Sequence, residues 1–131
     1  MNLILIDANV WIKYAHSKDI APIALPLFKY KLVPVANRYL FAEIFDALVD
    51  NQWMTIKQAT NLISLLNQVC FMVTERSVYR LSPDPKDNYI FDLAIQTNCA
   101  FIISDDTKLL SLKFQPVKTK SSNWLIKNFP L

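Results

Sequence analysis

The chain has 131 residues and no glycine, where roughly nine glycines would be expected from average usage. The missing glycines exclude P-loops, glycine-rich dinucleotide-binding turns and EF-hand loops, because each needs backbone conformations that glycine allows. Turns are therefore expected to use proline, asparagine, aspartate and serine. A hydrophobic content of 53%, with 19% charged residues and a net charge of +3, predicts a globular protein with one domain over residues 1–131.

Short apolar runs alternate with longer segments of helical spacing. The runs predict buried parallel strands at Leu3–Ile6, Leu32–Val35, Cys70–Val73 and Ala100–Ile103, with a weaker fifth strand near Pro116–Lys118. Helices are expected around the apolar stripe Leu40–Leu48, after Thr55 as N-cap and after Asp87. A last helix is expected from Ser121, with Ser121 or Ser122 as its cap. This alternation predicts the α/β class with a parallel sheet of four to five strands.

Acidic residues follow the predicted strands where a parallel sheet would bring them together. Asp7 follows the first strand, and Asp105 and Asp106 follow the fourth. The carboxyl ends of parallel strands share one edge of a sheet, which is where ligands bind. Asp87 begins a helix that can lie along that edge, and Glu43 lies in the helix after the second strand. Together these positions predict a site where several carboxylate side chains meet at the carboxyl ends of the strands.

Each acid also has a simpler interpretation when it is taken alone. Asp7, Asp87 and the pair Asp105–Asp106 fit helix N-caps or turns, and Glu43 fits the boundary of an apolar helix stripe. Asp92 lies one helical turn after Asn88 and is expected to face solvent.

Four carboxylates at one edge would repel each other unless a cation lies between them. Oxygen ligands favour Mg²⁺ or Mn²⁺, whereas the single His16 and the separated Cys70 and Cys99 argue against zinc. Such a metal site can hydrolyse a phosphodiester, because the cation lowers the pKa of a bound water and neutralises the phosphate. The two cysteines are interpreted as buried free thiols in a reducing cytosol.

Four segments that contain these acids occur in the order and spacing of one family. They are Ile4–Val10, Leu40–Leu48, Ser82–Asn88 followed by Asp92–Ala94, and Phe101–Leu110. With these segments the chain resembles the PIN-domain proteins, and among them the VapC-like toxins of toxin–antitoxin pairs. The resemblance implies a three-layer α/β/α sandwich with a mostly parallel central sheet, and a Mg²⁺-dependent endoribonuclease activity.

The resemblance also implies roles for individual residues. The metal-binding and catalytic acids of the family match Asp7, Glu43, Asp87 and Asp106. Supporting polar residues of the family match Asn9 and Ser104. An RNA substrate, a cognate antitoxin protein and a homodimer are the implied partners.

Two positions depart from the family pattern. Asp105 stands where a glycine often precedes the fourth acid, and Lys108 stands where a further acid often follows. The extra carboxylate of Asp105 could bind metal, or share or exchange the role of Asp106. We expect an active nuclease, and the alternative is a non-catalytic PIN-like module that binds RNA or a protein.

Basic and apolar residues predict where partners bind. Lys13, Arg38 and Lys108 are expected to hold the RNA backbone, with Lys31 as a further candidate. The stretch Ile20–Phe28 is apolar for a short surface helix, which indicates either core packing or a face covered by a partner. No apolar run reaches the length of a membrane span, so a soluble cytoplasmic protein is expected.

Two other α/β families that place aspartates at strand ends are disfavoured. Haloacid-dehalogenase-like phosphatases need a second aspartate two residues after the first, and that position is Asn9. Phospho-receiver domains need an aspartate after the third strand, where Thr74 and Glu75 follow instead.

Overall fold

The computed structural model describes residues 2–74 and 88–131, and its strands form one parallel sheet. The strands are β1 (Asn2–Ile6), β2 (Leu32–Ala36), β3 (Phe71–Met72), β4 (Ile102–Ile103) and β5 (Thr119–Lys120). They lie in the order β3-β2-β1-β4-β5, and every neighbouring pair is parallel. The predicted α/β class and parallel sheet are confirmed, although the fifth strand begins just after the run predicted for it.

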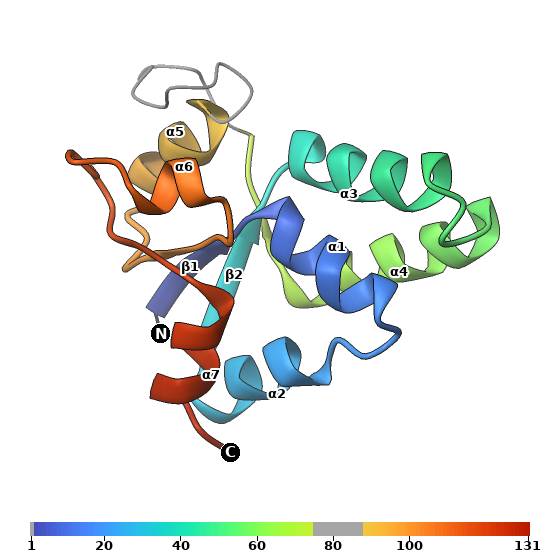
Figure 1. The fold of residues 1–131 in the computed structure, drawn as a ribbon, viewed down its shortest axis with the longest axis horizontal. Helices are drawn as coiled ribbons and strands as arrows, with labels where there is room; N and C mark the ends of the chain where they lie inside the picture. Colours follow the sequence, from blue (N-terminus) through green and yellow to red (C-terminus); the bar gives the residue numbers. More distant parts are fainter. Residues whose placement is uncertain (1, 75–87) are drawn as a thin grey trace.

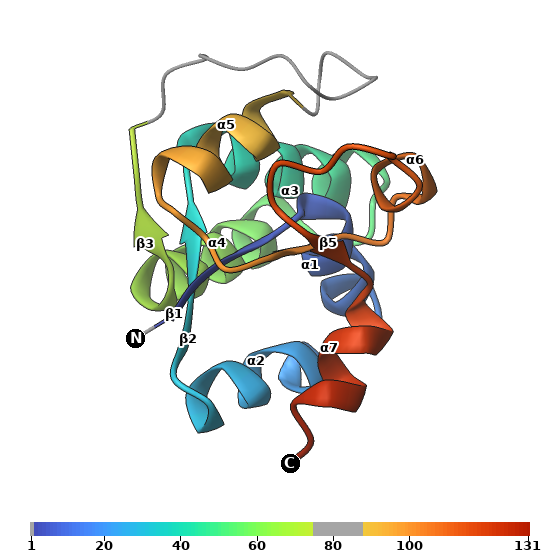
Figure 2. The same ribbon diagram turned by 90° about the vertical axis from the view of Figure 1, so that its left-hand side faces the viewer.

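Helices cover both faces of this sheet. They are α1 (Ala8–His16), α2 (Ala21–Lys29), α3 (Arg38–Asp50), α4 (Ile56–Val69), α5 (Asn88–Gln96), α6 (Thr107–Leu110) and α7 (Ser122–Asn128). Figure 1 shows α1, α3 and α4 together on one side of β1 and β2, with α5 and α6 on the other side. The view turned by 90° shows α5 in front of the upper end of β2, with α6 to the right, above β5 (Figure 2). The predicted three-layer sandwich is therefore confirmed.

Side-chain caps explain where several helices begin. The Thr55 hydroxyl accepts from the Gln58 N–H at 3.1 Å, and the Gln58 side chain accepts from the Thr55 N–H at 3.0 Å. This reciprocal capping box starts α4 at the predicted N-cap. Asn37 caps α3 through the Leu40 N–H, and Ser121 caps α7 in the same way. Each cap satisfies an N–H group that has no partner within its helix.

Within the described residues, four helices are followed, two residues after their last residue, by a residue with a positive φ angle, a position that favours glycine. These residues are Lys18, Lys31, Gln52 and Asn98, with φ between 55° and 63°. After α3, the Gln52 N–H donates to Val49 O at 2.9 Å, and the Trp53 N–H donates to Leu48 O at 3.0 Å. Serine or asparagine lies in three of these turns, as expected, at Ser17, Asn51 and Asn98, but three of the four positive-φ positions are lysine or glutamine.

Helix α5 is enclosed on almost all sides. Ile90, Phe91, Leu93 and Ala94 have no exposed surface, and Asp92 is only 1% exposed. The prediction that Asp92 faces solvent is therefore wrong. The helix packs against β1 and β2, and a helix that is apolar nearly all round has no solvent side to offer.

The two cysteines are free and buried, as predicted. Burial raises the pKa of the Cys70 thiol to about 12. Burial also raises the pKa of the Cys99 thiol, although a hydrogen bond with the Thr97 hydroxyl opposes this shift. Neither thiol is in the ionised form that reacts with electrophiles at neutral pH. Within the described residues, no helix is both long and apolar enough to cross a membrane.

The order of the strands defines one place where a ligand is expected. The chain moves outward from the central β1 to β2 and β3, and then returns to β4 on the other side of β1. Leu5 pairs with Ile102 and Ile6 pairs with Ile103, so β1 and β4 end side by side. In open parallel sheets, ligands bind outside the carboxyl ends of strands at such a change of direction.

Candidate functional site

Asp7 lies at this change of direction, directly after β1. Its N–H donates to Ile103 O at 2.8 Å, which continues the pairing between β1 and β4 by one residue. Its backbone occupies the N-cap position of α1, but its carboxylate makes no capping hydrogen bond. Instead, Asp7 Oδ2 accepts from the Ser104 hydroxyl at 2.8 Å and from the Asn9 amide at 3.2 Å. The carboxylate is thus held across the strand ends, at 4% exposure.

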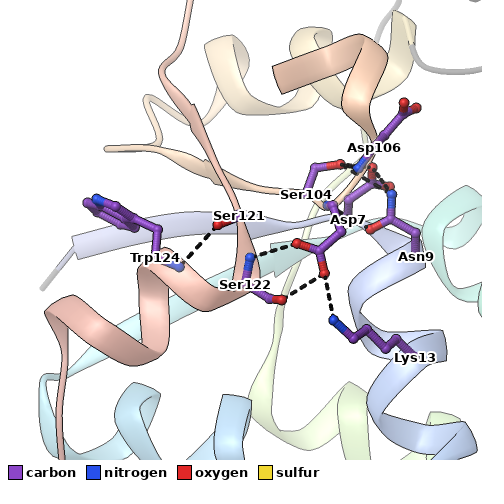
Figure 3. Close-up of polar contacts among 9 residues, drawn as sticks. Asp7, Asn9, Lys13, Ser104, Asp106, Ser121, Ser122 and Trp124 are labelled. Carbon is purple, nitrogen blue, oxygen red and sulfur yellow. Dashed lines mark hydrogen bonds and ion pairs between the residues drawn. The ribbon is translucent and has the colours of Figure 1, made fainter. Parts of the chain in front are cut away.

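Ser104 connects the two strand ends and is fully buried. Besides donating to Asp7, its hydroxyl oxygen accepts from the Asn9 amide at 3.2 Å and from the Asp106 N–H at 3.1 Å. The side-chain oxygen Oδ1 of Asn9 in turn accepts from the Asp105 N–H at 3.2 Å. Figure 3 shows these side chains converging where β1 and β4 end. The network orients Asp7 and the turn that carries Asp106.

Asp106 caps the short helix α6. Its Oδ1 accepts from the Lys108 N–H at 2.8 Å, so the interpretation of Asp106 as an N-cap is correct. Its Oδ2 accepts no hydrogen bond from any residue that the structure describes, and Figure 3 shows the carboxylate turned away from Ser122. The side chain of Lys108, which replaces a family acid, is exposed on α6.

Asp105 points in a different direction from Asp106. Its Oδ1 accepts from the Ser122 N–H at 2.8 Å, and its Oδ2 accepts from the Ser122 hydroxyl at 2.7 Å. Lys13, on α1, lies 3.5 Å from the same Oδ2. Partial burial would raise the pKa of the Asp105 carboxyl, but the two Ser122 hydrogen bonds and the Lys13 charge outweigh it and lower the pKa overall. Asp105 therefore ties the start of α7 and the middle of α1 to the end of β4.

Glu43 is exposed on α3 and is positioned by another helix. The Tyr89 hydroxyl of α5 donates to Glu43 Oε1 at 2.8 Å. The Tyr89 ring lies 6.3 Å from the ring of Tyr39, centre to centre. The sequence reasoning missed both this role of Tyr89 and that of Ser122, because each partner lies far along the chain and no local pattern connects them.

Three of the four acids that the sequence predicts as metal ligands, Asp7, Glu43 and Asp106, lie within the described residues. Asp87 lies outside the described residues. Over residues 2–74 and 88–131, no three acidic, histidine or cysteine side chains gather closely enough to hold a metal ion. Asp7 and Asp106 are linked through Ser104, whereas Glu43 contacts Tyr89. The donors are carboxylate oxygens, which fits a hard cation such as Mg²⁺ or Mn²⁺ better than zinc.

The basic residues predicted to hold RNA lie at different places. Lys13 pairs with Asp105 beside the site, and Arg38 begins α3 just beyond the end of β2. Lys31 lies immediately before β2, at the amino ends of the parallel strands, whereas Asp7 lies at their carboxyl ends. Lys31 is therefore not at the candidate site.

Comparison with known protein families matches residues 3–108 to the PIN domain. No curated protein matches the chain. The matched region begins in β1 and ends in α6, so it includes Asp7, Glu43 and the Ser104–Asp106 turn, whereas Ser122 lies outside it. Because the match covers most of its length, the chain belongs to the PIN domain family, whose members are generally nucleases that use divalent metal ions.

Proposed function

We propose that this protein is a metal-dependent endoribonuclease. The observation that carries the proposal is the buried Asp7 carboxylate, held by Ser104 and Asn9 where β1 and β4 end together. Carboxylate oxygens are the ligands that Mg²⁺ and Mn²⁺ prefer, and the hydrogen bonds from Ser104 and Asn9 orient this carboxylate. Membership of the PIN domain family supports a nuclease role for this edge of the sheet.

Oxygen ligands from different elements would hold the cation. They are Asp7, Glu43 and Asp106, with Asp87 as the proposed fourth. When bound, Mg²⁺ or Mn²⁺ supplies a water of lowered pKa and neutralises the charge that develops on the phosphate.

Other residues of the chain act by positioning these carboxylates. Ser104 and Asn9 fix the orientation of Asp7, and hydrogen bonds of this kind commonly set the strength of a metal site. Capping of α6 fixes the carboxylate of Asp106 in the same way.

A matched pair of variants tests the proposal. Asp7→Asn should lower the rate of RNA cleavage in Mg²⁺ or Mn²⁺ by more than about 100-fold, because losing a ligand exceeds the 10- to 100-fold cost of losing a residue that supports one. Asp50→Asn removes an exposed carboxylate from the far end of α3 and should leave the rate unchanged. Cleavage that persists in Asp7→Asn, or in the presence of a chelator, would contradict the proposal.

A non-catalytic module that binds RNA or a protein is the second candidate. Two observations favour it: Glu43 is hydrogen-bonded to Tyr89, and the described residues contain no group of three metal ligands. Wild-type protein that binds RNA tightly, yet cleaves no RNA with either metal, would establish this alternative.

We further propose that the protein is the toxin of a toxin–antitoxin pair. An apolar groove of about 360 Å³ lies between α1, α2 and α4, lined by residues that include Trp11, Leu27, Phe28, Leu65 and Val69. Phe28 is 67% exposed there, and an antitoxin or a second copy of the chain could cover it. Expression in bacterial cells should arrest growth unless Asp7 is changed to Asn. Normal growth with the wild-type protein would contradict the toxin role.

A further inference from the structure

A second hollow opens at the same edge of the sheet, outside the network around Asp7. Its volume is about 350 Å³, and its lining residues are Arg38, Tyr39, Met72, Val73 and Thr74. Arg38 and Tyr39 begin α3 just beyond β2, and Val73 and Thr74 follow β3 directly. The hollow therefore lies at the carboxyl ends of β2 and β3, on the side of β1 away from β4.

The wall of this hollow combines two exposed side chains, the aromatic Tyr39 and the apolar Met72, with the positively charged side chain of Arg38. Tyr39 is 48% exposed and Met72 is 39% exposed, so both side chains are accessible to a ligand. The Arg38 guanidinium carbon lies 4.9 Å from the centre of the Tyr39 ring, and Arg38 Nη2 donates to the Tyr39 hydroxyl at 3.0 Å. These contacts hold the ring and the guanidinium together at the surface.

A short series of contacts connects the Tyr39 ring to the proposed catalytic acid Glu43. The Tyr39 ring lies 6.3 Å from the Tyr89 ring, and the Tyr89 hydroxyl donates to Glu43. Tyr39 and Glu43 are also four residues apart on α3, which places them on the same face of the helix. A ligand bound on Tyr39 therefore lies next to Glu43.

We propose that this hollow is a subsite for one unpaired nucleotide of the RNA, which rests on the proposed nuclease function. The base stacks on Tyr39, and Arg38 binds the neighbouring phosphate. Proteins recognise single-stranded RNA in this way, with bases stacked on aromatic rings and guanidinium planes. A paired base is already stacked within its helix, so the subsite selects single-stranded segments or loops. The volume suits one base rather than a long peptide.

The test measures binding of a fluorescein-labelled single-stranded oligoribonucleotide to the intact protein, in EDTA so that no cleavage occurs. Tyr39→Ala should weaken the affinity by about 5- to 100-fold, the usual effect of losing one stacked base. Tyr39→Phe keeps the ring and should restore most of that affinity. Arg38→Gln should weaken binding and lower the slope of affinity against salt by about one. Trp53→Ala is the control, because this ring is 41% exposed, against 48% for Tyr39, and it follows the opposite end of α3.

A duplex of the same sequence separates the subsite from general electrostatic binding. The duplex should bind more weakly, and Tyr39→Ala should not change its affinity. Tyr39→Leu, checked by circular dichroism, is a second variant in case the alanine variant does not fold.

The outcomes separate this proposal from the proposed function. If Tyr39→Ala and Tyr39→Leu both bind the oligonucleotide as tightly as the wild type, while Asp7→Asn still abolishes cleavage, the subsite is wrong and the nuclease stands. If the wild-type protein binds the oligonucleotide but cleaves no RNA, and both Tyr39 variants lose this binding, the subsite stands and the nuclease proposal falls.

Discussion

The two halves of the candidate site are built in opposite ways. The strand-end half consists of Asp7, Asn9, Ser104 and the Asp105–Asp106 turn, and its contacts among short side chains and backbone N–H groups measure between 2.8 and 3.2 Å. The helix half consists of Tyr39, Glu43 and Tyr89, which are long side chains on α3 and α5 joined by one hydrogen bond and one ring contact.

This difference indicates different tasks for the two halves. Buried hydrogen-bonded groups have few alternative conformations, so the strand-end half is preorganised before substrate arrives. In the helix half, Tyr39 and Glu43 are exposed and can reorient when RNA and metal bind, which fits a region that receives the substrate. Variants of the residues that hold Asp7 in the strand-end half should therefore lower stability together with activity, and variants in the helix half should lower activity alone.

Among variants that change a residue outside the proposed ligand set, the largest effect is expected for Ser104→Ala, in the strand-end half. This variant removes the donor to Asp7 and the acceptor for Asn9 and for the Asp106 N–H, all in a buried position. Leaving buried polar groups unsatisfied costs about 1–3 kcal/mol each. We expect a loss of stability in that range, measured by urea unfolding, and a loss of cleavage rate of about 10- to 100-fold. Ser17→Ala, which removes an exposed hydroxyl, is the control; equal effects of the two variants would contradict this preorganisation.

A smaller effect, on stability alone, is expected for Asp105→Ala. Asp105 holds Ser122 and Lys13, so its loss should loosen α7 and cost about 1–2 kcal/mol of unfolding free energy. Because the Asp105 oxygens already accept these hydrogen bonds, the affinity for Mn²⁺ should change by less than about twofold. Asp105→Asn, which keeps the shape of the acceptor, should be intermediate in stability. A large loss of Mn²⁺ affinity in either variant would show that Asp105 is a metal ligand.

The smallest effect on stability is expected for Tyr89→Phe, in the helix half. The variant keeps the ring against Tyr39 and removes only the hydroxyl that donates to the exposed Glu43. The unfolding free energy should change by less than about 0.5 kcal/mol, as for most surface substitutions. The cleavage rate at saturating metal should still fall by roughly 2- to 10-fold, because Glu43 loses its orienting partner. A destabilisation as large as that of Ser104→Ala would remove the contrast between the halves.

Features that depend on consecutive residues were predictable from the sequence. The cap at Thr55, the cap at Ser121 and the first strand each rest on a few neighbouring residues, and the structure places them as expected. Asp7 and the Asp105–Asp106 turn follow from the same logic, because the carboxyl ends of parallel strands meet at one edge.

Features that depend on tertiary packing were not predictable in this way. Glu43 and Tyr89 are 46 residues apart, and Asp105 and Ser122 are 17 apart, so no periodicity connects them. The burial of Asp92 depends on which elements pack around α5, and the residues of that helix alone do not indicate them. Contacts of this kind decide which carboxylate faces a ligand and which one braces the fold.

The lack of glycine has a consequence for how this protein can be engineered. Lys18, Lys31 and Gln52 adopt a left-handed conformation that costs a residue with a side chain roughly 1–2 kcal/mol, and asparagine, as at position 98, tolerates it better. Glycine at the first three positions would relieve that strain, partly offset by its greater freedom in the unfolded chain. All three lie at helix ends outside both halves of the candidate site. Substituting glycine at these three positions is a starting point for a more stable variant of the protein, in which destabilising active-site substitutions still allow folding.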